Sequence, residues 1–397
     1  MVFHVWMYGS PGGVEDLGAF SRFVIPHLAV GVTLFFTLSG YLLYRPVVGA
    51  LLGDRALPPV GRYARNRALR VLPAYWMVLI AVGVAIPAAL VRLSASEVTL
   101  GRLAGEPGML LANAVLLQNF FAFSRDSGIG PAWSLAVELG FYLALPALGL
   151  LAATSFRCAR TLWTRVLALL APVGAMFVIG TTGKAAAAWA LSQEAGALEA
   201  ILARSFFTHA DLFAPGMALA VLHVILVRGA WRLPRWWPWI VGTALGADMV
   251  AVVVLADRGR LARWGVLNSY QRLTALACLL LVALVVLPQT ARGESSLVVR
   301  ALEWRPLALV GMASYSLFLW HEPVIRYLES SGQTSVGALG FLANLLVTGV
   351  LSGILAWATY AFVERPALKC KLSDAGVAAG EAGQGPAVKP LNGSAVA

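Results

Sequence analysis

Charged residues are scarce in this chain of 397 residues. Asp, Glu, Lys and Arg make up 12% of the sequence, against about 25% in an ordinary soluble domain, and hydrophobic residues make up 59%. A soluble core has no use for that much apolar surface. The composition therefore excludes an ordinary soluble protein and predicts a membrane protein.

Cysteine and metal-ligand motifs are also lacking. The three cysteines are Cys158, Cys278 and Cys370, and none has a metal-ligand neighbour at a usable spacing. We expect no disulfide framework and no metal. The net charge of +11 does not require a nucleic-acid partner, because most of it falls in segments beside the apolar runs, where membrane lipid is the expected partner.

What the sequence does have is long apolar runs, many of them close to the roughly 20 residues that a helix needs to cross a bilayer. Nine such spans are predicted, at residues 24–44, 71–91, 133–153, 166–182, 205–227, 237–255, 269–288, 306–328 and 337–362. Their apolarity is continuous and rich in Gly and Ala, which favours helices over barrel strands. The expected fold class is all-α, a polytopic transmembrane helical bundle in the inner (plasma) membrane.

The distribution of Lys and Arg predicts the orientation of the bundle. If the first span runs from outside to inside, the cytoplasmic segments are 45–70, 157–165, 228–235, 289–305 and the tail from 363, which together hold 19 of the 30 Lys and Arg residues. Arg258, Arg260 and Arg263 would then lie outside, against the trend.

The two ends of the chain and one short apolar segment differ from the nine long spans. Residues 1–6 have the pattern of the last turn of an apolar helix, so we expect a tenth span upstream, the alternative being a short start whose first eight residues lie in the interface. The apolar segment 109–123 is too short to span and is expected to be interfacial or re-entrant. We expect a membrane domain over 1–370 and a disordered cytoplasmic tail over 371–397.

Two arginines precede the second predicted span. Arg67 and Arg70 are three residues apart, so on a helix they lie on one face. Two guanidinium groups on one face suit a phosphate-rich ligand, because each can bind phosphate oxygens through two hydrogen bonds. The alternative is that they only anchor the span at the cytoplasmic surface.

A carboxyl group lies inside the third predicted span. Glu138 ends the segment WSLAVE at 133–138, about 7.5 Å below Trp133 along a helix. A carboxylate at that depth needs a cationic partner or a proton. Glu138 is therefore either half of an interhelical salt bridge or a group that orients a catalytic base.

Two histidines and a serine complete the polar candidates. His321 lies deep in a span, in the segment SYSLFLWHEP at 314–323, where it is either a hydrogen-bonded structural residue or a participant in proton transfer. His4 stands at the start of the chain and carries no signal from composition. Ser39, beside Gly40, indicates close helix packing, because no neighbouring base would make it a nucleophile.

Five segments, in this order, resemble the acyltransferase-3 family of membrane O-acyltransferases. They are GVTLFFTLSGY at 31–41, RxxR at 67–70 with LPAYW at 72–76, WSLAVE at 133–138, SYSLFLWH at 314–321, and ERP at 364–366. Each motif is weak alone, but five in order, each at a fitting depth, are specific. The resemblance covers about residues 1–370.

The resemblance implies ten spans and an acyl-CoA donor that enters from the cytoplasm, with acetyl-CoA as the expected donor. It also implies an acceptor hydroxyl on a polysaccharide, a lipid-linked glycan or a macrolide-type compound. The enzyme would then be an acyltransferase for groups other than aminoacyl groups. The closest rival is a multi-span transporter or flippase, against which we note the lack of an internal repeat and of acidic residues centred in spans apart from Asp248.

The resemblance also assigns residues. His4, after Phe3, matches the family's essential histidine; Arg67 and Arg70 match the RxxR motif proposed to hold the donor's phosphates; and Glu138 matches the motif glutamate. Glu322 departs from the family, which often has an aromatic residue there, and Leu139-Gly140 replaces an acidic and amide pair; we expect both to alter the acceptor site more than the chemistry.

A mechanism follows as a hypothesis. His4 takes the proton of the acceptor hydroxyl while Glu138 or a nearby donor orients it, and the acyl group transfers directly. An acyl-histidine intermediate is the alternative order of events. His321 completes the predicted catalytic residues, and Arg67 and Arg70 the predicted donor-binding residues.

Overall fold

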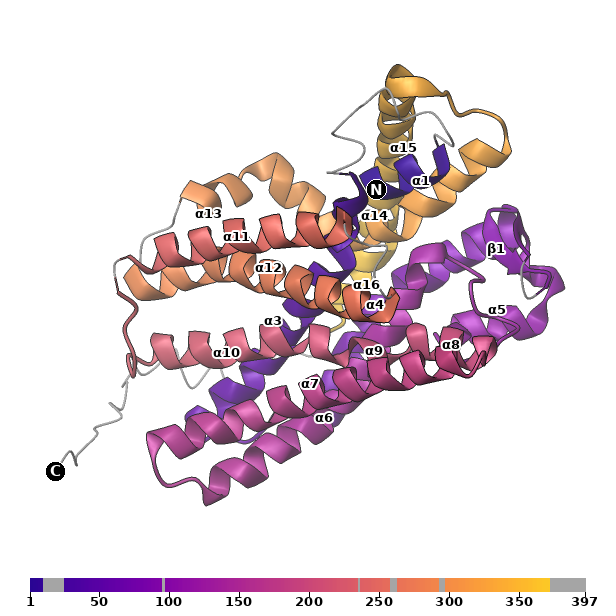
Figure 1. Ribbon diagram of the computed structural model, residues 1–397. Coiled ribbons are helices and arrows are strands. Elements are labelled where there is room, and N and C mark those ends of the chain that lie inside the picture. Colours follow the sequence, from indigo (N-terminus) through magenta and orange to yellow (C-terminus); the bar gives the residue numbers. More distant parts are fainter. Residues whose placement is uncertain (10–24, 95–96, 235, 258–262, 293–296, 372–397) are drawn as a thin grey trace.

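Long helices dominate the part of the chain that the computed structural model describes, which is residues 1–9, 25–94, 97–234, 236–257, 263–292 and 297–371. They form a bundle with a small β-hairpin at one end (Figure 1). The predicted tail beyond Lys371 lies outside the described residues, as do Arg258 and Arg260.

Seven helical segments among the described residues are long and apolar enough to cross a membrane. Three are a single helix or part of one: Gly31–Leu52 (α3), Leu162–Ser192 (α7), and Tyr270–Leu287 within α12 (Arg263–Arg292). Two join a helix to one turn: Val60–Ala85 consists of α4 (Val60–Ile80) and the π-turn η3 (Ala81–Ala85), and Gly130–Cys158 consists of the turn η6 (Gly130–Ala132) and α6 (Trp133–Cys158). Two join two helices through a turn: Phe206–Val227 consists of α9 (Phe206–His209), η7 (Ala210–Leu212) and α10 (Ala214–Val227), and Gly337–Lys369 consists of α15 (Gly337–Thr359), the π-turn η8 (Tyr360–Glu364) and α16 (Arg365–Lys369).

The other two predicted spans are also helices, α11 (Trp237–Asp257) and α14 (Arg305–Ser330), of 21 and 26 residues. Helix α14 includes Glu322, Arg326 and Glu329, which lower its hydropathy without shortening it. The protein is therefore a polytopic helical membrane protein, as the sequence predicts.

The predicted span at 71–91 is wrong at both ends. Helix α4 begins at Val60, so Arg67 and Arg70 lie within the helix, where arginine has a high helix propensity and its long side chain can reach polar surroundings. Past Ala85 the chain leaves the helix and, from Ala89, forms strand β1 (Ala89–Arg92), which pairs antiparallel with β2 (Val98–Gly101). The sequence analysis did not predict this hairpin.

The remaining helices are short. They are α1 (Val2–Gly9), α5 (Pro107–Ala114), α8 (Gly196–Ala203) and α13 (Leu297–Leu302). Helix α5 has eight residues, a length of about 12 Å, so the segment 109–123 cannot cross a membrane as one helix. Figure 1 shows the hairpin, α5 and α8 at the same end of the bundle, away from the turn between α6 and α7.

Segments predicted to face the cytoplasm meet at the opposite end. Arg228, after α10, donates to the carbonyl of Leu52 at the end of α3 (2.5 Å). Trp163, in the first turn of α7, and Trp231, which follows α10 in the sequence, have ring centroids 5.5 Å apart. The predicted cytoplasmic segments 45–70, 157–165 and 228–235 therefore lie close together in space.

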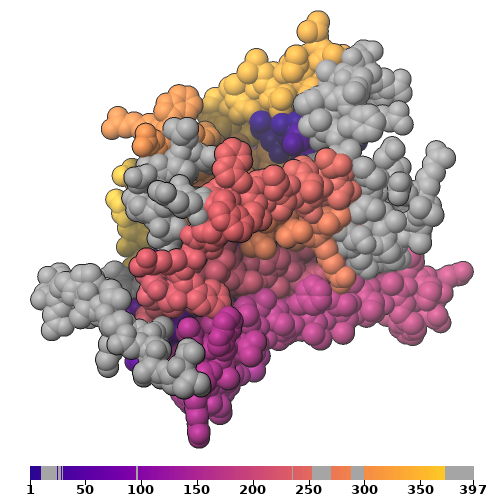
Figure 2. Space-filling view, turned by 60° about the vertical axis from the view of Figure 1, so that its left-hand side comes forward, coloured from indigo at the N-terminus to yellow at the C-terminus, as the bar shows by residue number. Residues whose placement is uncertain are grey.

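Close helix contact at two glycines fixes the centre of the bundle. A side chain at Gly40 of α3 would collide with the carbonyl of Phe213, and one at Gly216 of α10 would collide with the carbonyl of Thr37. Such small residues let two membrane helices approach closely. Beside this pair, α1 packs against α14 and α15, and Figure 2 shows its indigo surface next to the yellow-orange helices.

A buried ion pair joins three of the spans. Lys184 of α7 donates to both carboxylate oxygens of Asp211 in η7, at 2.6 and 2.5 Å, and each residue is under 5% exposed. Arg272 of α12 lies 3.6 Å from the same carboxylate and donates to Thr181 of α7. The sequence analysis missed this cluster, although each charge interrupts an apolar run.

Removing Asp211 should destabilise the bundle, because two cations would then share an uncompensated site. We expect Asp211→Ala to lower the free energy of unfolding by about 3–5 kcal/mol, and the double variant Lys184→Met, Asp211→Leu to lose less, since it removes a buried pair as a whole. Thermal unfolding of the purified protein in detergent measures both. Equal losses in the single and double variants would contradict this account.

Candidate active site

Two histidines from opposite ends of the chain meet in the structure. Nδ1 of His4 on α1 lies 2.8 Å from Nε2 of His321 on α14. His321 is 4% exposed, and its Nδ1 lies 2.8 Å from the carbonyl oxygen of Phe318 and 3.2 Å from that of Leu317. The structure thus brings together two residues that the sequence predicted separately as catalytic.

These hydrogen bonds define the tautomer of both rings in their neutral state. A backbone carbonyl only accepts, so Nδ1 of His321 carries the hydrogen and its Nε2 holds a lone pair. That lone pair accepts from Nδ1 of His4, which leaves Nε2 of His4 as the unprotonated nitrogen. In this arrangement Nε2 of His4 can act as a base that His321 orients, as the third group behind a catalytic histidine does.

A carboxylate lies near the other ring nitrogen of His4, the one that does not face His321. Oε2 of Glu322 lies 3.9 Å from Nε2 of His4, and its Oε1 accepts from Nε of Arg326 at 2.7 Å. The Arg326 guanidinium lies 3.8 Å from the ring centroid of Tyr8. A carboxylate at this distance favours a positive charge on the imidazole. Glu322 was not among the predicted site residues, although a carboxyl beside a buried histidine and four residues before an arginine was a usable signal.

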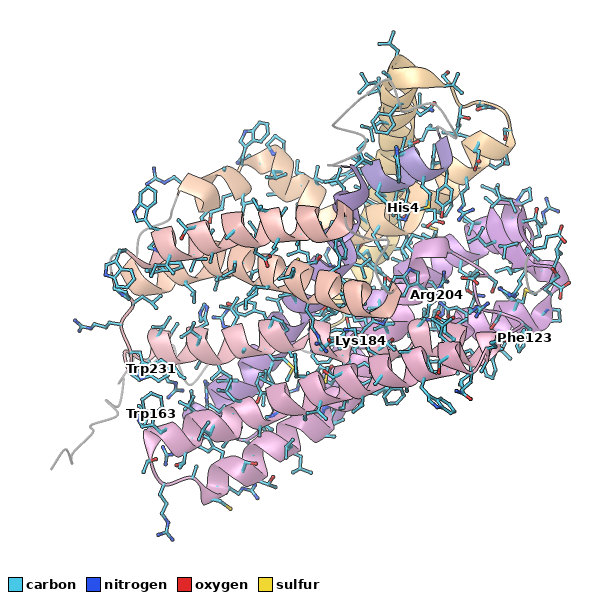
Figure 3. The ribbon with its side chains drawn as sticks, viewed as in Figure 1. His4, Phe123, Trp163, Lys184, Arg204 and Trp231 are labelled. Carbon is cyan, nitrogen blue, oxygen red and sulfur yellow. The ribbon has the colours of Figure 1, made fainter. Side chains whose placement is uncertain are left out.

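A cavity of about 600 Å³ opens beside His4. Its lining includes His4, Glu322 and Arg326 together with Trp133, Asn119 and Arg204. His321 does not line the cavity, so it contacts His4 from behind. Figure 3 labels His4 and Arg204, which come from α1 and from the segment between α8 and α9.

A second polar cluster lies deeper along the bundle. Arg70 of α4 forms an ion pair with Glu364 of η8, whose other oxygen accepts from the hydroxyl of Ser316 on α14 at 2.9 Å. The side chain of Glu364 is fully buried. Glu364 and Ser316 lie in motifs that carry the family resemblance, but the sequence analysis gave neither a role in binding Arg70.

Arg67, Glu138 and Lys371 surround this cluster. Nε of Arg67 is buried and has no hydrogen-bond partner among the described residues. Glu138 accepts from Ser39 at 2.7 Å, with Arg67 and Arg70 as its nearby cations. Burial, followed by repulsion from Arg67 and Arg70, lowers the pKa of Lys371. The structure therefore places Glu138 beside the arginines, and its hydrogen bonds are to Ser39 and Tyr142, not to either histidine.

Helix α14 connects the two clusters. Ser316 and His321 are five residues apart on this helix, an axial separation of about 7.5 Å. Tyr315, also on α14, lies beneath the guanidinium of Arg70, whose central carbon is 5.8 Å from the ring centroid. A flexible ligand with its anionic end at the arginines could therefore reach the histidine pair.

Metal ligands do not gather in the described part of the chain. No group of three or more His, Cys, Asp or Glu side chains there could hold a metal ion. The chemistry that this arrangement can perform is proton transfer at Nε2 of His4, beside a cavity large enough for a small organic acceptor.

Comparisons with known proteins extend these observations. The chain is 26% identical over 348 residues to the exopolysaccharide production protein ExoZ of Rhizobium meliloti, a match that covers 86% of this chain and 90% of that protein. It is 24% identical over 380 residues to the O-acetyltransferase OatA of Staphylococcus aureus, covering 90% of this chain and 57% of OatA. A putative peptidoglycan O-acetyltransferase of Bacillus subtilis, YrhL, is 25% identical over 355 residues, covering 85% and 50%.

The chain thus spans only about half the length of OatA and YrhL, and most of ExoZ. No solved structure matches the chain. The sequence model of a family described as an acyltransferase domain matches residues 1–361, which is nearly the whole membrane part. The protein therefore belongs to the acyltransferase-3 family and is a multi-pass membrane acyltransferase.

Proposed function

We propose that the protein is an O-acetyltransferase of the plasma (inner) membrane that moves an acetyl group from acetyl-CoA, on the cytoplasmic side, to a hydroxyl of a carbohydrate. The single observation that carries this proposal is the hydrogen bond between His4 and His321 beside the cavity. It leaves Nε2 of His4 as a base at the point where a bound hydroxyl would lie.

The chemistry balances with these groups alone. Nε2 of His4 takes the proton of the acceptor hydroxyl, the hydroxyl oxygen attacks the thioester carbonyl, and the carbon–sulfur bond breaks. The departing thiolate takes the proton back from His4, so the products are an ester and free coenzyme A. Glu322 stabilises the imidazolium while it exists, because its carboxylate is 3.9 Å from the protonated nitrogen.

The donor side is formed by Arg67, Arg70 and Lys371, with Glu364 and Ser316 as the partners around Arg70; we call this group the arginine cluster. Arg67 has a buried Nε with no partner among the described residues, and Lys371 adds a cation whose pKa is lowered by burial and then by Arg67 and Arg70. Phosphate groups of coenzyme A would relieve the repulsion among Arg67, Arg70 and Lys371. We assign Glu138 to this side, where with Ser39 it positions Arg67, and no metal has a role in the scheme.

The relatives favour a carbohydrate acceptor over a macrolide-type compound. ExoZ is named for exopolysaccharide production, and OatA and YrhL as O-acetyltransferases, the latter putatively of peptidoglycan. These names support polysaccharide modification as the role of this chain. The acyl chain is taken as acetyl on the same ground.

The test is transfer from radiolabelled acetyl-CoA in sealed membrane vesicles, with the donor on the cytoplasmic side and candidate glycans on the other. Labelled ester on the glycan supports the proposal. If glycan or donor crosses the membrane and no ester forms, the multi-span transporter becomes the better explanation.

Variants of the two histidines should distinguish the role of His4 as the base from the role of His321 as the residue that positions it. We expect His4→Ala to lower kcat by about 10²- to 10⁴-fold, the usual contribution of a general base. His321→Ala should lower kcat and leave KM for both substrates unchanged. His321→Gln should recover part of the activity, because its side-chain oxygen can accept from Nδ1 of His4.

Rates from steady-state kinetics in detergent provide the measurement, with thermal unfolding as the control for folding. An unchanged kcat in His321→Ala would contradict the positioning role. Label that stays on wild-type protein and is missing from His4→Ala would show an acyl-histidine intermediate in place of direct transfer.

Arg67 and Arg70 should differ although they share one motif. Arg70→Ala leaves the buried Glu364 without its cation and should cost about 1–3 kcal/mol of stability. Arg67→Ala removes no ion pair, so it should leave stability unchanged and raise KM for acetyl-CoA. Thermal unfolding together with KM for acetyl-CoA checks both; a stability loss in Arg67→Ala that matches Arg70→Ala would refute the distinction.

A further inference from the structure

The cavity beside His4 is lined by two arginines that the transfer chemistry does not use. Arg204 and Arg326 both line it, together with Asp126 and Glu322. Arg326 pairs with Glu322, whereas Arg204 binds Asp126. Each arginine thus reaches the cavity while held by a carboxylate.

Asp126 is shared by three arginines. Its Oδ2 lies 3.0 Å from Nη1 of Arg92 and 3.2 Å from Nε of Arg125, and its Oδ1 forms an ion pair with Arg204. Arg204 lines the cavity, whereas Arg92 and Arg125 do not. The single charge of Asp126 is therefore divided among three guanidinium groups, and Arg204 receives only part of it.

The surrounding backbone holds Asp126 in place. Asp126 has a positive φ of 68°, and Gly128, two residues later, exchanges two backbone hydrogen bonds with Leu90 of β1, at 2.9 and 2.8 Å. The side-chain amide of Asn113 donates to Ser127 at 2.8 Å. The hairpin missed by the sequence analysis thus fixes Asp126, and through it the arginines.

Arg204 is the member of the trio that reaches furthest into open space. Its side chain is 36% exposed, against 8% for Arg92 and 16% for Arg125. The side-chain amide of Asn119 donates to its carbonyl at 2.9 Å, which fixes the backbone from which it projects. Arg204 also lies close enough to Tyr8 and Glu322 to interact electrostatically with both, so it faces the region of Arg326 and His4.

Other lining groups suit a sugar. Trp133, Tyr8 and Phe318 present aromatic rings to the cavity, against which the apolar face of a sugar ring can pack. Gln118 and Asn119 also line it, are 2% and 1% exposed, and each keeps a side-chain oxygen with no donor among the described residues. Buried acceptors of this kind are usually satisfied by water or by a hydroxyl-bearing ligand.

We propose that the acceptor is an acidic carbohydrate whose carboxylate or phosphate binds between Arg204 and Arg326 while a nearby hydroxyl meets His4. This inference rests on the proposed function and names the class of its acceptor. Two guanidinium groups that line one cavity can bind such an anion through charge-assisted hydrogen bonds. A neutral sugar would bring no negative charge to Arg204, which shares the carboxylate of Asp126 with two other arginines.

The experiment measures binding apart from turnover. Wild-type protein in nanodiscs of phosphatidylcholine is titrated by calorimetry with a glucuronate-containing disaccharide, with the matched glucose-containing disaccharide, and with glucose 1-phosphate. We expect the two anionic probes to bind. The neutral one should bind about tenfold or more weakly, because it lacks the charge-assisted pair of hydrogen bonds.

Arg204→Gln should abolish this preference, and Arg204→Lys should retain part of it. Arg125→Gln is the matched control, because it removes the same charge from the same carboxylate but lies outside the cavity lining; it should keep the preference. Thermal unfolding identifies any variant that fails to fold, and Arg204→Lys then carries the test.

Three results would overturn the assignment: equal binding of neutral and anionic probes, equal effects of Arg204→Gln and Arg125→Gln, or an Arg204 effect confined to nanodiscs with anionic lipid. The last would make Arg204 a ligand of lipid phosphate. If the anionic probes bind and no acetyl group is transferred, the anion site stands and the transferase mechanism is refuted. If acetyl is transferred with no preference for anionic acceptors, the transferase mechanism stands and the anion site is refuted.

Discussion

Lipid offers no hydrogen-bond partner, so a polar group buried between the helices is stabilised where it finds a partner within the chain. Such pairs also fix the packing of the helices. Lys184 with Asp211 joins α7 to the start of α10, and Arg70 with Glu364 joins α4 to the end of α15. His4 with His321 joins the first helix to α14 across 317 residues of sequence.

Helix α14 carries residues of both polar clusters, the one around Arg70 and the one around His4. Its Ser316 contributes to the arginine cluster, its His321 and Glu322 contact His4, and its Arg326 reaches the cavity. A rigid helix keeps these side chains in fixed register, at about 1.5 Å of rise per residue. Helix α14 is not among the seven segments that are long and apolar enough to cross a membrane, because it includes Glu322, Arg326 and Glu329, which is expected of a span that faces other polar residues and not lipid.

The sequence predicted the helical class because composition and the length of apolar runs depend on the solvent, which for this chain is a bilayer. It placed Arg67 and Arg70 on one helix face, and the structure has them both on α4. It did not predict the ion pair of Arg70, because the partner, Glu364, lies 294 residues away. Contacts of this kind follow from the tertiary fold, not from local pattern.

The acceptor side was harder still. The sequence analysis judged Glu322 only as a departure from a family pattern, and it read residues 71–91 as a span, so the hairpin that holds Asp126 could not be expected. His4 became a candidate through resemblance alone, since eight helical residues at a chain start carry no periodic signal. Its position against His321 and the cavity is the independent observation that the structure adds.

The π-turn at Tyr360–Glu364 sets the direction in which Glu364 points. A π-turn holds one residue more than the α-helical turn it replaces, so it rotates all that follows by about 100° relative to an uninterrupted helix. A relative with one residue fewer here would keep every polar residue of the motifs and still turn this carboxylate away from Arg70. When two members of the family are aligned, a single gap at this place therefore indicates a change in the partner of Arg70, even where all the motif residues are identical.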